Sequence, residues 1–308
     1  MSITSISAVH RKKKMRGIKY LLIALPFMVF VFLMSYVPLF GWIYSLFDYK
    51  PGLPLSSLHF VGLANFQRMF TQYKEIFRVL RNTLALSGLN LILSPLPIVF
   101  AIMLNELTSS KVRRFVQTTT TLPNFISWIV VYGFAFAIFS NNGLINMVLR
   151  SMGMQGSTTG IIGDVNSVWA FQTFLMAWKS LGWSAIIYLA AILGIDQEQY
   201  EAAKIDGANR VRCIWHITVP GVLPTYFVLL LLSISNVLSN GFDQFFVFTN
   251  PMVSSRIEVL DYYVYKIGII FNQYSYSIAI GITKSLISLA LLFIANFASK
   301  KIRGHSIF

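Results

Sequence analysis

The sequence predicts an all-α membrane protein that crosses the bilayer six times. Hydrophobic residues make up 56% of the 308 residues and charged residues only 12%, whereas about a quarter of the residues in a soluble domain are charged. The mean hydropathy is +0.65. The apolar residues gather in runs of about 20 residues with few charges, the length that an α-helix needs to cross a bilayer. Composition and patterning therefore indicate a multi-pass membrane protein.

Six runs meet this length criterion. The first follows a basic cluster and is too long for the apolar core of a signal peptide. The fourth and the sixth each contain one lysine, Lys179 and Lys284. We expect Lys284 to extend its ammonium to the membrane surface, because it lies near the outer end of its run. The predicted spans are 20–47, 83–104, 122–139, 169–193, 221–240 and 278–298.

The distribution of positive charge predicts how these spans are oriented. Because their number is even, both termini lie on one side of the membrane. If that side is the cytoplasm, the cytoplasmic segments hold fifteen of the 25 lysines and arginines, and the longer outer segments hold eight. Cytoplasmic loops are enriched in these residues. We therefore predict an N-in, C-in topology with cytoplasmic segments 1–19, 105–121, 194–220 and 299–308.

Prolines interrupt several predicted spans. Each one removes a backbone donor and bends its helix. In a membrane, the freed carbonyls need neighbouring helices or a water-filled cavity. Pro26 and Pro38 in the first span are explained by bending alone. The Pro95-Leu96-Pro97 pair in the second span predicts a helix that lines a cavity.

Several function classes are disfavoured by what the sequence contains. The net charge of +14 does not indicate nucleic-acid binding, because the basic residues are divided among several loops. A single cysteine, Cys213, and four scattered histidines provide neither an internal disulfide nor a metal site. No phosphate loop, catalytic triad or pair of acids in one span is present. We therefore expect a chain that is not an enzyme and holds no cofactor.

A polar segment between the fourth and fifth apolar runs, Asp196–Pro220, is the exception to the lipophilic pattern. Its first part, Glu198–Lys204, has good helix formers with acidic residues near the start, where the helix dipole favours them. Gly207 is positioned to end that helix. A second amphipathic piece follows, and we expect Pro220 to stop it and to start the fifth span. The residues alone fit either a projection that docks into a soluble partner or an amphipathic loop on the lipid surface.

This segment resembles the cytoplasmic signature of permease subunits of binding-protein-dependent ABC importers. That signature reads Glu-Ala-Ala, three residues, Gly, nine residues and Ile-x-Leu-Pro. Only the leucine differs, being replaced by Val219. The matching residues are Glu201, Ala202, Ala203, Asp206, Gly207, Ala208, Ile217 and Pro220.

The resemblance extends over nearly the whole chain. It narrows to the subfamily that imports complex oligosaccharides or polysaccharide fragments. The segments that carry this narrower resemblance are Trp178–Trp183, Tyr188–Ala191, Tyr200–Ala203 and Asp261–Tyr265.

The resemblance implies the type I importer permease fold in a bacterial cell membrane. It also implies a second homologous permease subunit, two cytoplasmic ATPase subunits that bind ATP and Mg²⁺, and an extracytoplasmic solute-binding protein that delivers an oligosaccharide. The loop 194–220 would enter a cleft of an ATPase subunit. The residues implied in this coupling are Glu201, Ala202, Ala203, Asp206, Gly207, Arg210, Ile217 and Pro220.

Candidate sugar contacts are aromatic or hydrogen-bonding side chains in or beside the spans. Lys179 allows two interpretations. At mid-membrane it would need a partner, such as a uronate carboxylate of the cargo. If the residues before it follow the outer surface, it extends outward instead, and we favour this interpretation. The candidates are Asn90, Trp128, Tyr132, Trp178, Lys179, Trp183, Tyr188, Asn236 and Asn240.

The predicted organisation has four parts: a basic cytoplasmic tail (1–19), a first span with its outer loop (20–81), a permease core (82–298) and a cytoplasmic tail (299–308). Two alternatives to the oligosaccharide importer remain open. One is the same architecture with another solute, such as glycerol phosphate. The other is a self-powered secondary transporter, which the missing inverted repeats and the scarcity of acids in the spans disfavour.

Overall fold

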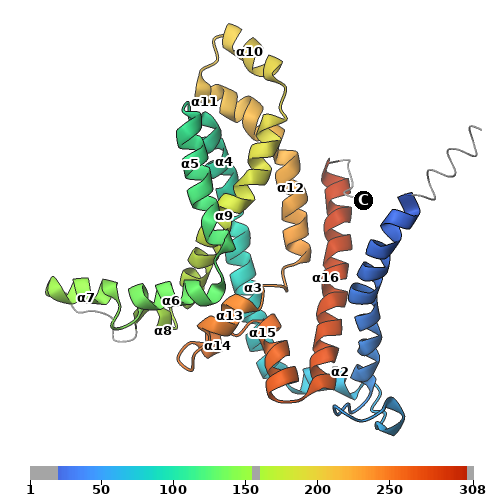
Figure 1. The fold of residues 1–308 in the computed structure, drawn as a ribbon. Helices are drawn as coiled ribbons and strands as arrows, with labels where there is room; N and C mark the ends of the chain where they lie inside the picture. Colours follow the sequence, from blue (N-terminus) through green and yellow to red (C-terminus); the bar gives the residue numbers. More distant parts are fainter. Residues whose placement is uncertain (1–19, 155–159, 304–308) are drawn as a thin grey trace, which may run out of the picture. The chain divides into compact units, whose positions relative to one another are not determined.

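The computed structural model describes residues 20–154 and 160–303 (Figure 1). Within these ranges the chain is helical and contains only two isolated β-bridges. Two compact units are present: residues 20–68 with Ile267–Ile282, and Met69–Lys266 with the residues after Ile282. The predicted tail 1–19 and the last five residues of the predicted tail 299–308 lie outside the described residues.

Among the residues that the structure describes, five helical stretches are long and apolar enough to cross a membrane. A sixth candidate is a bent pair of helices, so the prediction of six spans holds when this pair counts as one span. The five stretches are Tyr20–Leu46, Tyr73–Glu106, Val168–Leu193, Arg210–Ser235 and Tyr274–Lys301.

The bent pair corrects the prediction of a straight span over 122–139. Helix α5 (Ser110–Thr121) continues into the short helix η4 (Leu122–Phe125), and α6 (Trp128–Phe139) starts after a bend of 102°. Ile126 and Ser127 are extended, and the Ser127 side chain accepts a hydrogen bond from the Val130 N–H. This capping starts a new helix inside the apolar run, which hydropathy alone cannot reveal.

The smaller unit contains the first span. The residues of this span are almost all exposed and apolar, as expected for a surface that faces lipid or another subunit. The span changes from α to π at η1 (Phe32–Tyr36) and to 3₁₀ at η2 (Val37–Leu46), whose second residue is Pro38. Before η3 (Leu55–Ser57), the backbone N–H of Tyr49 donates to the Ser275 hydroxyl at the start of α16 (Tyr274–Arg303).

The larger unit is built around α9 (Val168–Leu193), in which eleven of the 26 residues are buried. Helices α3 (Tyr73–Leu93), α4 (Leu96–Glu106), α5 and α12 (Val219–Ser235) pack against it. Gly182 permits the close approach of α5, since a Cβ at this position would overlap the backbone carbonyl of Thr120. The apolar residues buried between α4, α9 and α12 are Ala101, Ala185, Tyr188, Leu189, Ile192 and Val222.

A second apolar cluster lies at the other end of α9. It joins α6 and the start of α9 to α13 (Asp243–Phe248) and α14 (Ser254–Ile257). The shorter helices of the larger unit are α7 (Leu144–Ser151), α8 (Gly160–Gly163) and α15 (Leu260–Tyr265), whereas most residues of α2 (Ala64–Thr71) and η6 (Lys266–Ile270) belong to the smaller unit. The fully buried residues of the second apolar cluster include Val168, Phe248, Val253, Ile257 and Val259.

The expectation that Pro220 stops one helix and starts another is wrong. Helix α11 (Arg210–Cys213) continues through the π-helix η5 (Ile214–Thr218) into α12, so one helical stretch runs from Arg210 to Ser235. Pro220 follows the π-helical turns, whose altered hydrogen bonding accommodates a residue without an N–H. The stretch also ends five residues before the predicted boundary at Asn240.

Candidate transport cavity and coupling loop

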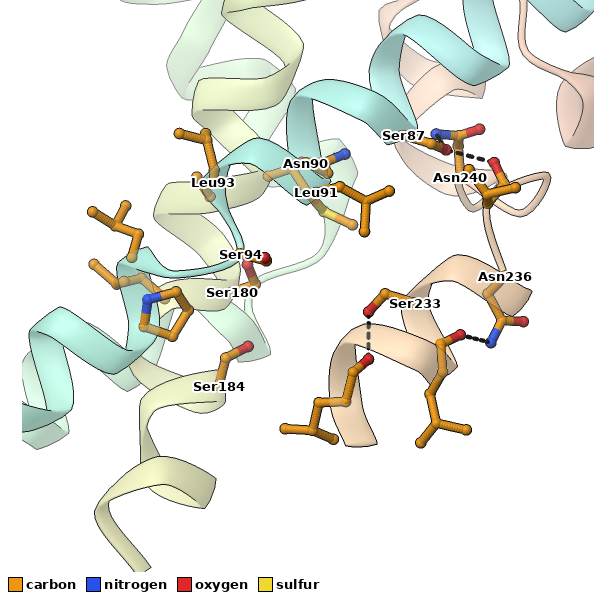
Figure 2. Close-up of a pocket in the computed structure, with 18 of the residues that line it drawn as sticks. Ser87, Asn90, Leu91, Leu93, Ser94, Ser180, Ser184, Ser233, Asn236 and Asn240 are labelled. Atoms are coloured by element: carbon orange, nitrogen blue, oxygen red, sulfur yellow. Dashed lines mark hydrogen bonds between the residues drawn. The ribbon is translucent and has the colours of Figure 1, made fainter. Parts of the chain in front are cut away.

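A cavity of about 470 Å³ lies between the α3–α4 junction, α9 and the end of α12 (Figure 2). Apolar and uncharged polar side chains share its wall, and none of the described residues that line it is a lysine, arginine, aspartate, glutamate or histidine. Ser94, Leu96 and Pro97, at the break between α3 and α4, form part of this wall, as the proline pair predicted. The polar lining residues are Ser87, Asn90, Ser94, Ser180, Ser184, Tyr188, Ser233, Asn236, Ser239 and Asn240.

Two of these side chains form a directed hydrogen-bond chain. The Ser87 hydroxyl donates to the carbonyl of Val237 over 2.6 Å, so it can only accept from Asn240, whose Nδ2 lies 2.9 Å away. Because the Nδ2 of Asn240 faces Ser87, the Oδ1 of Asn240 points away from Ser87. Among the described residues that oxygen is buried and has no partner. Because Asn240 lines the cavity, the cavity wall contains a polar acceptor whose hydrogen bonding is not satisfied.

A second polar contact lies on the same wall. The hydroxyls of Ser94 and Tyr226 are 2.9 Å apart and join the end of α3 to α12. Ser180 and Ser184 lie one turn apart on α9. The sequence analysis did not predict these serines as cavity residues, although residues four apart share a face of a helix. The available signal was this spacing of small polar residues within apolar spans.

The structure brings together some of the predicted cargo contacts and separates others. Four of them line the cavity: Asn90, Tyr188, Asn236 and Asn240. The predicted aromatic contacts Trp128 and Tyr132 instead pack edge-to-face against Phe248 in the second apolar cluster. Trp178 lines a separate apolar hollow, and Trp183 packs edge-to-face on Phe125.

The position of Lys179 contradicts the favoured prediction that its side chain extends outward to the membrane surface. Helix α9 is continuous from Val168, so Lys179 lies near its middle, and only 9% of the residue is exposed. Its ammonium donates to the carbonyls of Pro123, Asn124 and Ile126 at 2.9, 2.8 and 2.5 Å. An ammonium has three donors. None remains for a cargo carboxylate, so pairing with a uronate is not supported either.

Lys284 also differs from its prediction. It forms an ion pair with Asp261, and both side chains are largely buried. The second carboxylate oxygen of Asp261 accepts the N–H of Gly241 at 3.1 Å. This lysine therefore has a local partner and does not extend freely to the membrane surface.

The polar segment folds into a helix, a turn and a second helix. Asp196 caps α10 (Gln197–Ile205) by accepting the Glu198 N–H at 3.0 Å. Gly207 has a φ of +78°, a conformation that glycine adopts readily. The N–H of Gly207 bonds to Lys204 O and that of Ala208 to Ala203 O, which completes a Schellman motif. The Asn209 side chain then caps α11 through the Arg212 N–H.

This loop presents an exposed tip above a tethered base. At the base, the hydroxyls of Tyr200 and Thr218 lie 3.0 Å apart and join α10 to η5. At the tip, 87% of Ile205 is exposed, which is unfavourable for an isolated chain in water. Glu201, Ala202, Asp206 and Arg210 are also exposed, Ala203 and Ile217 are partly buried, and Pro220 lies on the continuous helix. The structure therefore leaves most of the predicted coupling residues accessible.

A cleft of about 650 Å³ lies beneath the loop, between α10, α11 and the α4–α5 junction. Arg113 holds this junction by donating to the carbonyl of Leu107 at 2.9 Å. Within residues 20–154 and 160–303, no group of three or more histidine, cysteine or acidic side chains is arranged to bind a metal ion.

A bundle of apolar helices around a polar cavity, with a projecting polar loop between two spans, defines a multi-pass membrane transport subunit. The chain belongs to the family of binding-protein-dependent transport system inner membrane components, whose family model matches residues 93–304.

Two relatives from Bacillus subtilis (strain 168) align along nearly the whole chain. The polygalacturonan/rhamnogalacturonan transport system permease protein YteP is 38% identical over 295 residues, or 94% of this chain and 90% of that protein. Protein LplB is 36% identical over 289 residues, or 93% of this chain and 90% of that protein.

This chain is also similar to a chain of a solved ABC transporter structure. The structure is a bacterial alginate ABC transporter in complex with an alginate pentasaccharide-bound periplasmic protein. One of its chains matches with a TM-score of 0.85 and 30% sequence identity, covering 96% of this chain and 99% of that chain.

Proposed function

We propose that this chain is one of two permease subunits of an ATP-driven importer for oligosaccharides. The observation that carries the proposal is the uncharged cavity lined by hydroxyl and amide groups. Sugars present many hydroxyl donors and acceptors. The buried, unpartnered Oδ1 of Asn240 offers one of them an acceptor in the membrane-spanning part of the chain.

The relatives support this class of cargo. YteP is a polygalacturonan/rhamnogalacturonan transport system permease protein, and the similar solved structure is an alginate ABC transporter in complex with an alginate pentasaccharide-bound periplasmic protein. We propose that an extracytoplasmic solute-binding protein likewise delivers the oligosaccharide to this permease, and that a second homologous permease completes the pathway. In this arrangement the permease core is 82–298, and the first span with its outer loop is 20–81.

We further propose that two cytoplasmic ATPase subunits bind ATP and Mg²⁺ and move the permease through the loop 194–220. The exposed tip of this loop and its capped helices suit insertion into a cleft of a soluble partner. The Schellman turn keeps the tip compact, and the Tyr200–Thr218 contact joins it to the fifth span. The contacting residues would be Glu201, Ala202, Ala203, Asp206, Gly207, Arg210, Ile217 and Pro220.

The alternative cargo, glycerol phosphate, has less support. A phosphate group is normally bound by arginine, lysine or several backbone N–H groups. The residues that line the cavity provide no cationic side chain. A self-powered secondary transporter is not proposed, since the chain belongs to a binding-protein-dependent family.

Transport by the reconstituted complex tests this function. The complex of both permeases and the ATPase subunits is placed in proteoliposomes with its solute-binding protein. Uptake of neutral oligosaccharides, acidic oligosaccharides and glycerol phosphate is then measured with and without ATP. We expect ATP-dependent oligosaccharide uptake that requires the binding protein. Uptake of glycerol phosphate alone, or uptake without ATP, would contradict the proposal.

A further inference from the structure

One cluster of side chains lies outside both the cavity and the coupling loop. It comprises Arg81 on α3, Trp169 on the first turn of α9 and Arg256 on α14. The guanidinium carbons of Arg256 and Arg81 lie 4.9 and 5.9 Å from the centroid of the Trp169 ring. Both distances are within the range in which a cation is attracted to an aromatic face. In the predicted orientation this arginine–tryptophan cluster lies on the outer side of the membrane.

The cluster is held by a rigid frame. The indole N–H of Trp169 donates to the carbonyl of Arg256 at 2.6 Å, which fixes the ring. Asn82, which is completely buried, donates to the carbonyls of Ser255 and Glu258 at 3.1 Å each. These bonds tie α3 to α14, so the two arginines keep their positions relative to the ring. The arrangement therefore exists before any partner binds.

The charges of the two arginines are not neutralised within the described chain. Each of the three ion pairs among the described residues involves another cation: Arg78, Lys266 or Lys284. The buried carboxylate nearest in sequence, Glu258, already binds both Arg78 and Lys266. Arg81 donates only long hydrogen bonds, to Asn82 Oδ1 at 3.4 Å and Ser255 O at 3.5 Å. The cluster therefore presents uncompensated positive charge.

We infer that the arginine–tryptophan cluster is a docking point for a carboxylate side chain of the solute-binding protein, an inference that rests on the proposed function. A guanidinium binds a carboxylate through two parallel hydrogen bonds. Arginine and tryptophan are also the residue types that contribute most often to protein–protein binding. Arg81 is exposed and Trp169 and Arg256 are only partly buried, so the cluster is open to the surface of a protein partner. The similar alginate transporter was solved with a periplasmic protein bound.

Stimulation of ATP hydrolysis by the solute-binding protein tests this inference. The probe is the binding protein that supports uptake by the wild-type complex, loaded in turn with a neutral and an acidic oligosaccharide. The variants are Arg81→Gln, Arg256→Gln and both together, and Lys74→Gln removes an exposed outer charge as a matched control. The half-stimulating concentration of binding protein and the maximal rate are measured at low and high salt.

We expect the double variant to raise the half-stimulating concentration by about five- to tenfold at low salt, with a smaller difference at high salt and an unchanged maximal rate. The shift should be equal for both cargoes. Arg81→Lys and Arg256→Lys should restore part of it, because they keep the charge but lose the planar fork. Lys74→Gln should cause little change.

Three results would overturn the inference. An unchanged half-stimulating concentration excludes the cluster as a docking point. A shift confined to the acidic cargo assigns the cluster to cargo carboxylates. Poor co-purification of the second permease with the double variant assigns it to the interface between permeases. Failure of every binding protein to stimulate the wild-type complex would instead contradict the proposed function itself.

Discussion

The ammonium of Lys179 donates a hydrogen bond to the backbone carbonyl of Pro123 over 2.9 Å, from the middle of one predicted span to the break in another. Two further carbonyls, those of Asn124 and Ile126, complete its donor set. The carbonyls at the end of a helix have no partner within the helix and carry partial negative charge. Lys179 satisfies them where water is scarce, so it stabilises the bend between η4 and α6.

Replacement of Lys179 by methionine should therefore destabilise this region. It removes one donor from each of the carbonyls of Pro123, Asn124 and Ile126, of which Pro123 still accepts the Ile126 N–H. Each carbonyl that stays buried without any donor costs about 1–3 kcal/mol. We expect a lower thermal unfolding midpoint of the purified complex and reduced uptake. Lys111→Met, at an exposed position on α5, is the matched control. Equal unfolding midpoints for the two variants would show that Lys179 does not hold the bend.

Gly182 should tolerate no side chain. A Cβ there would overlap the backbone of Thr120 and Thr121, so Gly182→Ala must push α5 away from α9. Overpacking of this kind costs about 1–3 kcal/mol. The variant should unfold at lower temperature than the wild-type complex. Gly133→Ala on α6 is the control, because a Cβ there meets nothing within 4 Å. Similar stability of both variants would contradict the close packing of α5 on α9.

Ser87 should affect transport through Asn240. Ser87→Ala removes the acceptor that orients the Asn240 amide, and Asn240→Leu removes the cavity acceptor itself. Loss of one hydrogen bond to the cargo weakens binding by about 0.5–1.5 kcal/mol, or about two- to thirteenfold. Both variants should raise the cargo concentration for half-maximal uptake. Ser151→Ala, outside the cavity, should not. Unchanged values for Asn240→Leu would remove it from the pathway.

The Lys284–Asp261 pair can be measured by a double-mutant cycle. Single substitutions Lys284→Gln and Asp261→Asn each leave the other charge without its partner. Substitution of both should cost less than the sum of the single effects, with a coupling free energy of about 0.5–3 kcal/mol in stability. Additive effects on the free energy of unfolding would show that the two side chains do not stabilise the fold through each other.

Hydropathy was sufficient to predict most of the helical architecture. The first, fourth and sixth spans begin and end within a few residues of the long apolar runs, because lipid solvates only apolar side chains. The helices of the second and fifth spans begin at Tyr73 and Arg210, well before their apolar runs. The coupling loop was also accessible to prediction, since its caps Asp196, Gly207 and Asn209 depend on local sequence. The break at Ile126 and Ser127 was not, because it lies inside an apolar run and its support comes from Lys179, more than fifty residues later.

Tertiary contacts likewise explain the difference between predicted and observed site residues. Large aromatic side chains such as Trp128 and Tyr132 fill the apolar cluster around Phe248, where their area is best buried. Small polar residues line the cavity instead, because they leave space there. The partner of Lys284, Asp261, also comes from a distant segment. Sequence spacing identifies such residues only when the packed helices are known.

The most direct test of the account compares ATP hydrolysis with uptake in variants of the coupling loop. Gly207→Pro forces a negative φ where the turn needs +78°, and Glu201→Lys reverses an exposed charge at the proposed ATPase contact. Gly194→Ala, at a negative φ, is the control. We predict that both variants insert and assemble, and that the complex still hydrolyses ATP but imports little oligosaccharide. Normal uptake per ATP hydrolysed by Gly207→Pro and Glu201→Lys would contradict the central claim that this loop drives the permease.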